Sequence, residues 1–181
     1  MRRVEAIRTA PLFCACVERI EAAEADREFC RHGMPHLLDV ARISWIGSLE
    51  RGLGFDREVV YAAALLHDIG RAEQYATGED HDVAGVRIAE EILDALPEEL
   101  RFDACERAMI VDAVAGHRGA SGSADQIAGA GAGGGACDGE IDGSLSTLIK
   151  DADGRSRACY ACSARGACYW ADERKNLSLD I

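Results

Sequence analysis

The sequence predicts an all-α protein built as a helical bundle. Apolar residues recur at helical spacing through most of the chain, and no segment alternates convincingly with a period of two residues. With 181 residues, 48% of them hydrophobic, the chain is long enough to bury a stable core as one domain. We therefore expect about six helices packed around one apolar interior.

The expected helices follow one another along the chain with short connections. Asp56 is expected to cap the third helix, and Pro97 to end the fourth. Residues 71–79 are interpreted as a loop. The predicted helical ranges are 3–28, 35–51, 57–68, 80–96, about 98–118 and 145–157.

Residues 119–143 differ in composition from the rest of the chain. Gly, Ala, Ser and Asp dominate them, which is typical of a flexible insert. They do not form a phosphate-binding loop of the Walker type, because the required Gly-Lys-Ser/Thr ending is missing. We expect a helical domain over residues 1–158 that contains this insert, and a cysteine-containing tail over residues 159–181 packed on that domain.

The charge balance limits the partners of the protein. Acidic residues outnumber basic ones by 32 to 20, giving a net charge of −12, and no block of Lys and Arg is present. Binding to duplex nucleic acid is therefore not expected. No apolar run reaches membrane-spanning length, and the stretch 11–17 is too short for a signal peptide. These features predict a cytoplasmic protein without a membrane partner.

The segment Leu65-Leu66-His67-Asp68-Ile69-Gly70 is the strongest candidate for a functional site. An apolar helix there delivers adjacent His and Asp side chains to its end, and Gly70 follows. Further candidate metal ligands lie at or near other predicted helix ends, and they are His36, His81, His117 and Asp153. Imidazoles together with carboxylates suit Fe, Mn, Zn or Co. A single histidine on an apolar helix is more often a hydrogen-bonded core residue, so the metal interpretation depends on the whole set.

These residues resemble the signature of the HD-domain metal-dependent phosphohydrolase superfamily, which reads His, His-Asp and Asp across a helical bundle. The resemblance covers roughly residues 30–158. The segments 81–85 and Gly116-His117 look like the two extra histidines of the dinuclear branch, which includes the HD-type diadenosine tetraphosphate hydrolases. The resemblance implies an HD-domain helical bundle that binds two divalent transition metal ions, with Fe or Mn favoured.

The same resemblance implies how the ligands divide between the metals. One metal would take His36, His67, Asp68 and Asp153. The second would take His81 and His117, with Asp68 bridging the two metals. Asp153 is preferred over Asp151 because it stands in an Ala-Asp-x-x-Ser-Arg form typical of this branch. Residues two apart on a helix point about 200° apart, so Asp151 and Asp153 cannot both face one metal.

The activity implied is hydrolysis of a phosphoester or phosphoanhydride, with a nucleotide as the favoured substrate and a metal-bridging hydroxide as the attacking group. Asp68 would act in catalysis as the bridge. Arg71 and Arg118 follow the His-Asp pair and His117, and with Lys150 they are candidates to meet phosphate charge. His32 could line the same pocket.

Two alternative functions use the same residues. Some HD-domain proteins are mixed-valent di-iron oxygenases, and the ligand spacing does not separate them from hydrolases. The other alternative is a metal- or redox-sensing regulatory module with a vestigial HD site.

The tail carries the motif Cys159-x2-Cys162-x5-Cys168. Structural zinc and iron–sulfur clusters commonly take four ligands. Cys30 is the favoured fourth ligand, since a metal shared by His36 and Asp153 would bring their neighbouring segments together. The motif therefore indicates a zinc site or an iron–sulfur cluster, against the alternative of incidental cysteines.

Overall fold

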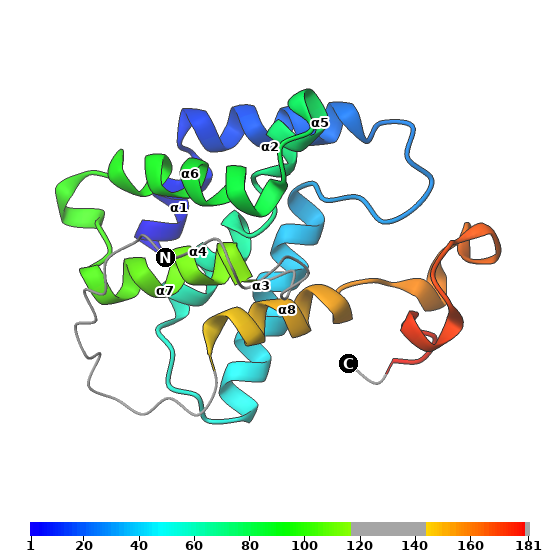
Figure 1. Cartoon of the computed structure of the whole chain (residues 1–181). Helices are drawn as coiled ribbons and strands as arrows, with labels where there is room; N and C mark the ends of the chain where they lie inside the picture. Colours follow the sequence, from blue (N-terminus) through cyan, green and yellow to red (C-terminus); the bar gives the residue numbers. More distant parts are fainter. Residues whose placement is uncertain (117–143, 180–181) are drawn as a thin grey trace, which may run out of the picture.

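The computed structural model describes residues 1–116 and 144–179, and within these ranges it contains helices and connecting segments but no strand (Figure 1). The all-α prediction is confirmed. The α-helices are α1 (Arg2–Arg8), α2 (Pro11–Ala23), α3 (Met34–Glu50), α4 (Arg57–Leu66), α5 (Arg71–Thr77), α6 (His81–Asp94), α7 (Ala104–Gly116) and α8 (Leu145–Arg155). Short 3₁₀ turns are η1 (Glu98–Leu100), η2 (Cys159–Ala161), η3 (Arg165–Ala167) and η4 (Asp172–Arg174).

Helix α4 lies at the centre of the bundle. It packs against α1, α3, α7 and α8, and most of its side chains, including the run 62–66, are buried. Its start is fixed as predicted by Asp56, whose side chain accepts hydrogen bonds from the backbone N–H groups of Glu58 and Val59. Because α4 is enclosed on several sides, its C-terminal end delivers His67 and Asp68 into the interior of the protein.

The prediction of one helix over residues 3–28 is wrong. The chain turns after α1, and Pro11 opens α2 at a position where its missing N–H costs nothing. Helix α2 ends at Ala23, and Glu24 begins a connection to α3. Continuous apolar spacing across the break concealed it in the sequence.

The prediction of a loop over residues 71–79 is also wrong. Residues Arg71–Thr77 form α5, which packs against α2 and α6, buries Ala72 and ends at Gly78 with φ +84°. A helix of this length has too few turns to show a periodic pattern, and tertiary packing stabilises it instead.

Helix α7 begins later than predicted. Asp103 and Glu106 form a reciprocal capping box, in which each side chain accepts from the backbone N–H of the other residue. This box sets the start of α7 at Ala104, while the residues after Pro97 form η1. The predicted insert at 119–143 lies outside the described residues.

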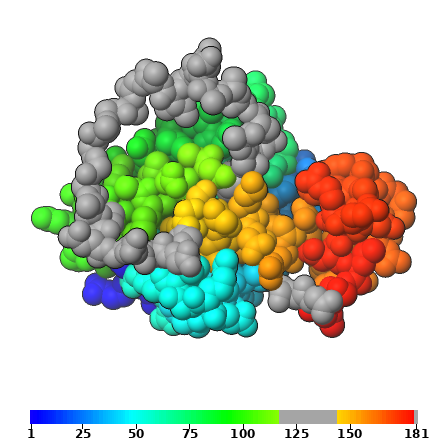
Figure 2. Space-filling view, turned by 60° about the horizontal axis from the view of Figure 1, so that its bottom comes forward, coloured from blue at the N-terminus to red at the C-terminus, as the bar shows by residue number. Residues whose placement is uncertain are grey.

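The residues after α8 form a separate lobe beside that helix, coloured orange to red in Figure 2. Asn176 joins the lobe to the end of α8, because its side-chain amide donates to the backbone carbonyls of Gly154, Arg155 and Arg157. Among the helices of residues 1–116 and 144–179, none combines the length and apolar character needed to cross a membrane.

Candidate metal centre

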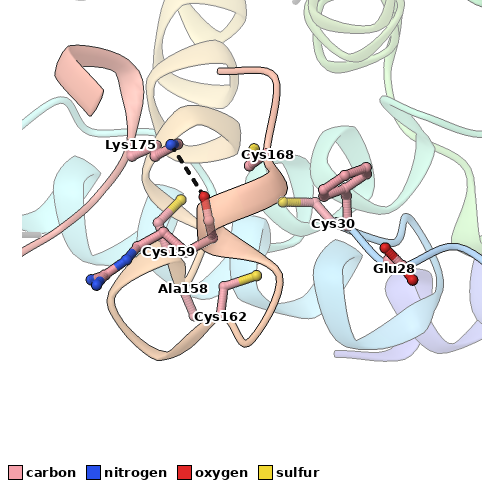
Figure 3. A pocket seen from close by; sticks show the side chains of 9 residues that line it. Glu28, Cys30, Ala158, Cys159, Cys162, Cys168 and Lys175 are labelled. Atoms are coloured by element: carbon pink, nitrogen blue, oxygen red, sulfur yellow. Dashed lines mark hydrogen bonds between the residues drawn. The ribbon is translucent and has the colours of Figure 1, made fainter. Parts of the chain in front are cut away.

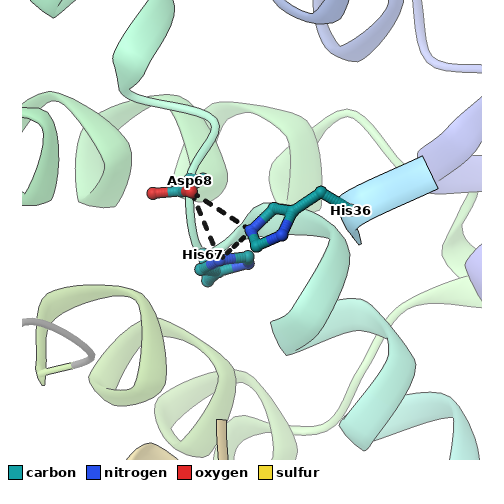
Figure 4. Close-up of side chains that lie close together, drawn as sticks. All are labelled: His36, His67 and Asp68. Carbon is teal, nitrogen blue, oxygen red and sulfur yellow. Dashed lines mark hydrogen bonds and ion pairs between the residues drawn. The ribbon is translucent and has the colours of Figure 1, made fainter. Parts of the chain in front are cut away.

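His36, His67 and Asp68 converge in the interior of the bundle (Figure 4). Nε2 of His36 lies 3.4 Å from Nε2 of His67 and 3.5 Å from Oδ2 of Asp68. Nε2 of His67 lies 3.4 Å from the same Asp68 oxygen. One donor atom from each of the three residues thus lies within 4.8 Å of the others, and the group could hold a metal ion.

Hydrogen bonds orient all three described candidate histidines in the same way. His67 directs Nδ1 to the carbonyl oxygen of Ala64 at 2.7 Å, and His81 directs Nδ1 to Oε1 of Gln74 at 3.2 Å. Both oxygens can only accept, so Nδ1 carries the proton and Nε2 keeps its lone pair. Such an arrangement is the one found around metal-bound imidazoles.

Ser156 likewise keeps the proton of His36 on Nδ1 and leaves the lone pair on Nε2. The Ser156 hydroxyl donates to the carbonyl oxygen of Asp153 at 2.8 Å, which leaves its oxygen to accept from Nδ1 of His36 at 3.2 Å. The lone pair of His36 Nε2 therefore points to His67 and Asp68. Sequence reasoning missed the roles of Ser156 and Gln74, although Ser156 stands in the motif used to select Asp153.

The two oxygens of Asp68 face opposite groups of side chains. Oδ2 faces His36 and His67, whereas Oδ1 lies 3.6 Å from Nε2 of His81 and 2.8 Å from Nε of Arg71. Asp68 and His81 are each 1% exposed. The carboxylate thus lies between His36 and His67 on one side and His81 and Arg71 on the other.

Asp153 and Asp151 have different surroundings on α8. Oδ1 of Asp153 lies 3.4 Å from Nε2 of His36. Asp151 instead pairs with Arg155 at 3.2 Å on the exposed side of the helix. Asp153 remains 36% exposed and approaches the His36 side of the group, while His117 and Arg118 lie outside the described residues.

The donor atoms fit a metal ion. Ligands held 2.0–2.1 Å from one tetrahedral ion lie about 3.4 Å apart, which is the spacing seen between the His36, His67 and Asp68 atoms. Burial lowers the pKa of His67, but the Asp68 carboxylate outweighs that effect and leaves the pKa above its ordinary value. The centre therefore attracts positive charge, and a divalent ion would supply it.

A close approach of two glycines positions His81. A Cβ atom at Gly70 would collide with the carbonyl oxygen of His81 and lie 2.8 Å from Cα of Gly85. Only a glycine at position 70 lets the turn after Asp68 touch the first turns of α6. This contact brings His81 to the Oδ1 side of Asp68.

Glu24 holds the connection between α2 and α3, and sequence reasoning missed it. Its buried carboxylate accepts from the backbone N–H of His32 at 2.6 Å, and from His32 Nδ1 and the Tyr75 hydroxyl at 2.5 Å each. Burial raises the pKa of Glu24, but these hydrogen bonds outweigh it and lower the pKa from 4.5 to about 2. Glu24 thereby orients His32 through Nδ1, and the ring of His32 lies edge-to-face with that of His36, with 5.3 Å between the ring centroids.

An open groove of about 1030 Å³ leads from the surface to His36 and Asp153. Despite the net charge of −12, the charged side chains of its lining are mostly basic, with seven Lys and Arg and three acidic residues. We call it the basic groove, and its cations are Arg27, Arg71, Lys150, Arg155, Arg157, Arg174 and Lys175. The chain therefore concentrates positive charge beside the candidate metal centre.

The four candidate cysteines do not belong to this centre. Cys30, Cys159, Cys162 and Cys168 line a second pocket of about 210 Å³ between the α2–α3 connection and the tail. The structure thus brings Cys30 to the tail cysteines, at the place expected for a fourth ligand.

Comparisons with known proteins agree with this architecture. The model of the family described as HD domain matches residues 34–158. An uncharacterized protein of Clostridium beijerinckii is 33% identical over 163 residues, which cover 90% of this chain and 88% of that protein. Among solved structures, a predicted HD superfamily hydrolase from an uncultured Thermotogales bacterium matches with a TM-score of 0.53. Its identity is 20%, over 91% of this chain and 81% of the other, so this likeness concerns the fold.

Proposed function

Because the chain belongs to the HD-domain family, we propose that it is a metal-dependent phosphohydrolase that cleaves a phosphoester or phosphoanhydride, with a nucleotide as substrate. The observation that carries this proposal is the basic groove, which opens onto His36 and Asp153. A phosphorylated substrate would be repelled by the overall charge of the protein but attracted by this lining. The structural neighbour described as an HD superfamily hydrolase supports the same reaction class.

The metal ligands in this proposal follow from the donor atoms. His36, His67 and Oδ2 of Asp68 would hold one divalent ion, with Asp153 completing its ligands from the groove side. His81 and Oδ1 of Asp68 would face a second ion, for which His117 is the expected further ligand. Bound ions of this kind would polarise phosphoryl oxygens. They would also lower the pKa of a bound water molecule, so that hydroxide is available to attack phosphorus near neutral pH.

The side chains of the groove have separate tasks in substrate binding. Arg71 keeps Asp68 in place through its ion pair and also lines the groove, where it can meet phosphate oxygens. Tyr169 is 73% exposed at the groove, and its ring offers a surface on which a base can stack. This combination of cations and an exposed ring favours a nucleotide over a simple phosphomonoester.

The test is a substrate screen with metal-loaded protein. Manganese- or iron-loaded enzyme is assayed against nucleotides, dinucleoside polyphosphates and generic phosphodiesters. We expect His67→Ala and Asp153→Ala to lose metal and at least about a hundredfold in turnover, since removing even the hydrogen-bond partner of a ligand costs 10–100-fold. Asp151→Ala is the matched control for Asp153, because its carboxylate pairs with Arg155 and should leave the metal content intact.

Two results would contradict the proposal. Wild-type turnover in both His67→Ala and Asp153→Ala would show that the reaction does not depend on a metal held by these residues. An activity that requires reduced iron together with oxygen would assign the chain to the oxygenases of the superfamily.

A further inference from the structure

Four cysteines from distant parts of the sequence surround one pocket. Cys30 comes from the α2–α3 connection, Cys159 begins η2, and Cys162 and Cys168 follow in the tail. Figure 3 shows their sulfur atoms on different sides of a common space rather than as two separate pairs. All four are free cysteines. We call this arrangement the four-cysteine pocket.

The tail has no apolar core that would hold it in this shape. None of the apolar residues in 159–179 is buried, although the segment winds through η2, η3 and η4. Its internal ion pair between Lys175 and Asp172 is exposed on the Asp172 side, and such pairs stabilise little. Small segments without a core are usually held by disulfides or by a metal, and the free thiols leave the second option.

The spacing of the thiols separates two kinds of metal site. Four sulfurs bound 2.3 Å from a single tetrahedral zinc ion lie about 3.8 Å apart. Within the described residues, the only group of three His, Cys, Asp or Glu donors that lie within 4.8 Å of one another is the His36 group. No three of the four sulfurs therefore lie within 4.8 Å of one another, a wider spacing than a single zinc ion would impose on them. An iron–sulfur cube bonds each thiolate to a different iron, which requires a wider set.

We propose that the four-cysteine pocket binds a [4Fe–4S] cluster. Assembly takes up two ferrous ions, two ferric ions and four sulfide ions without a net change of oxidation state; four iron–sulfur bonds replace the four thiol S–H bonds, and the protons leave to solvent. The bound cluster and its thiolates carry net negative charge. Lys175, whose side chain is 8% exposed, and Arg165 line the pocket and would balance that charge.

The cluster would also shape the basic groove. Phe29, Cys30, Cys168 and Lys175 line both pockets, so the two sites share a wall. The tail also supplies Trp170 to the groove, with the guanidinium groups of Arg157 and Arg174 at 4.4 and 4.1 Å from its ring. A cluster that fixes the tail therefore fixes these cations of the groove.

The experiment is anaerobic reconstitution of the full chain with ferrous and ferric iron in equal amounts and with sulfide. Acid-labile sulfide, iron and zinc are measured per chain before and after reconstitution, with visible absorption and Mössbauer spectra. We expect about four sulfides per chain, as one [4Fe–4S] cluster requires. One zinc per chain without sulfide would overturn the proposal, and about two sulfides would replace the cube by a two-iron cluster. Reconstituted protein without bound sulfide would overturn it as well.

Variants separate this site from the candidate metal centre. Cys162→Ser should lose the sulfide, whereas Cys14→Ser, on α2 beside the carbonyl oxygen of Arg8, should keep it. His67→Ala should keep the full sulfide content while losing the iron of the other site. Sulfide lost in Cys14→Ser to the same extent as in Cys162→Ser would contradict the assignment of the ligands. Because the wild-type stoichiometry decides the cluster type, the test stands even if Cys162→Ser folds poorly.

Discussion

At the scale of single residues, the candidate metal centre is defined as much by hydrogen-bond acceptors as by its ligands. Candidate ligands could be found in the sequence because His-Asp is distinctive and metal chemistry restricts residue types. The acceptors Ala64, Gln74 and Ser156 could not, because an acceptor is recognised only once the ring orientation is known. Asp153 was preferable to Asp151 only through a resemblance, and the structure places Asp153 beside His36.

Ser156 provides a direct test of this orientation. Removing its hydroxyl in Ser156→Ala takes the acceptor from Nδ1 of His36 and frees the ring to turn. We expect the affinity for Mn²⁺ to fall about 10–100-fold, measured by competition with a chelator. Ser163→Ala, at an exposed serine of the tail, is the control. Equal affinities in both variants would show that Ser156 does not orient the ligand.

At the scale of helices, the sequence predicted long elements well and short ones poorly. Helices α3, α4, α6 and α8 were placed within a few residues, because each buries an apolar stripe over several turns. The break at Pro11 and helix α5 depend on tertiary contacts that periodicity does not report. Helix α5 lies beside the candidate site, since it carries Arg71 and Gln74.

The contact between the turn after Asp68 and α6 gives a prediction at this scale. Gly70→Ala would place a methyl group against backbone atoms that cannot move without displacing α6. We expect destabilisation of about 2 kcal/mol, seen in thermal unfolding as a Tm lower by roughly 4–8 °C. In Gly166→Ala a Cβ meets nothing within 4 Å, so this control should melt like the wild type. A wild-type Tm for Gly70→Ala would refute the close approach.

At the scale of the whole molecule, the charge is distributed unevenly: the protein has a net charge of −12, but one groove has more basic than acidic side chains. The composition predicted an acidic protein correctly, but it could not show that seven of its twenty Lys and Arg residues line one groove. That gathering depends on which side chains share a surface once α3, α8 and the tail meet. The location of Cys30 in the four-cysteine pocket follows from the same meeting of segments.

Lys150 tests whether the basic groove binds substrate. It is exposed on α8 within the groove, so Lys150→Gln removes one positive charge without disturbing the core. We expect KM for the best substrate to rise about tenfold with little change in kcat, because a contact kept in the ground and transition states affects binding alone. The effect should shrink as salt is added.

Arg107→Gln is the matched control for this measurement. It removes the same charge from a site paired with Asp94 on α6, which does not line the groove. We expect KM to stay at the wild-type value. An equal rise in both variants would attribute the effect to net charge rather than to the groove.

Because the two pockets share a wall, binding in one pocket would change the binding affinity of the other. Cys30, Cys168 and Lys175 belong to both, so a molecule in the groove and a cluster in the four-cysteine pocket both favour the ordered arrangement of the tail. Such coupling is reciprocal. If the bound cluster raises the affinity for substrate by some factor, bound substrate raises the affinity for the cluster by the same factor. A substrate-saturated protein would therefore release its iron more slowly under oxidants or chelators than the free protein. The lifetime of the cluster would therefore increase with the substrate concentration.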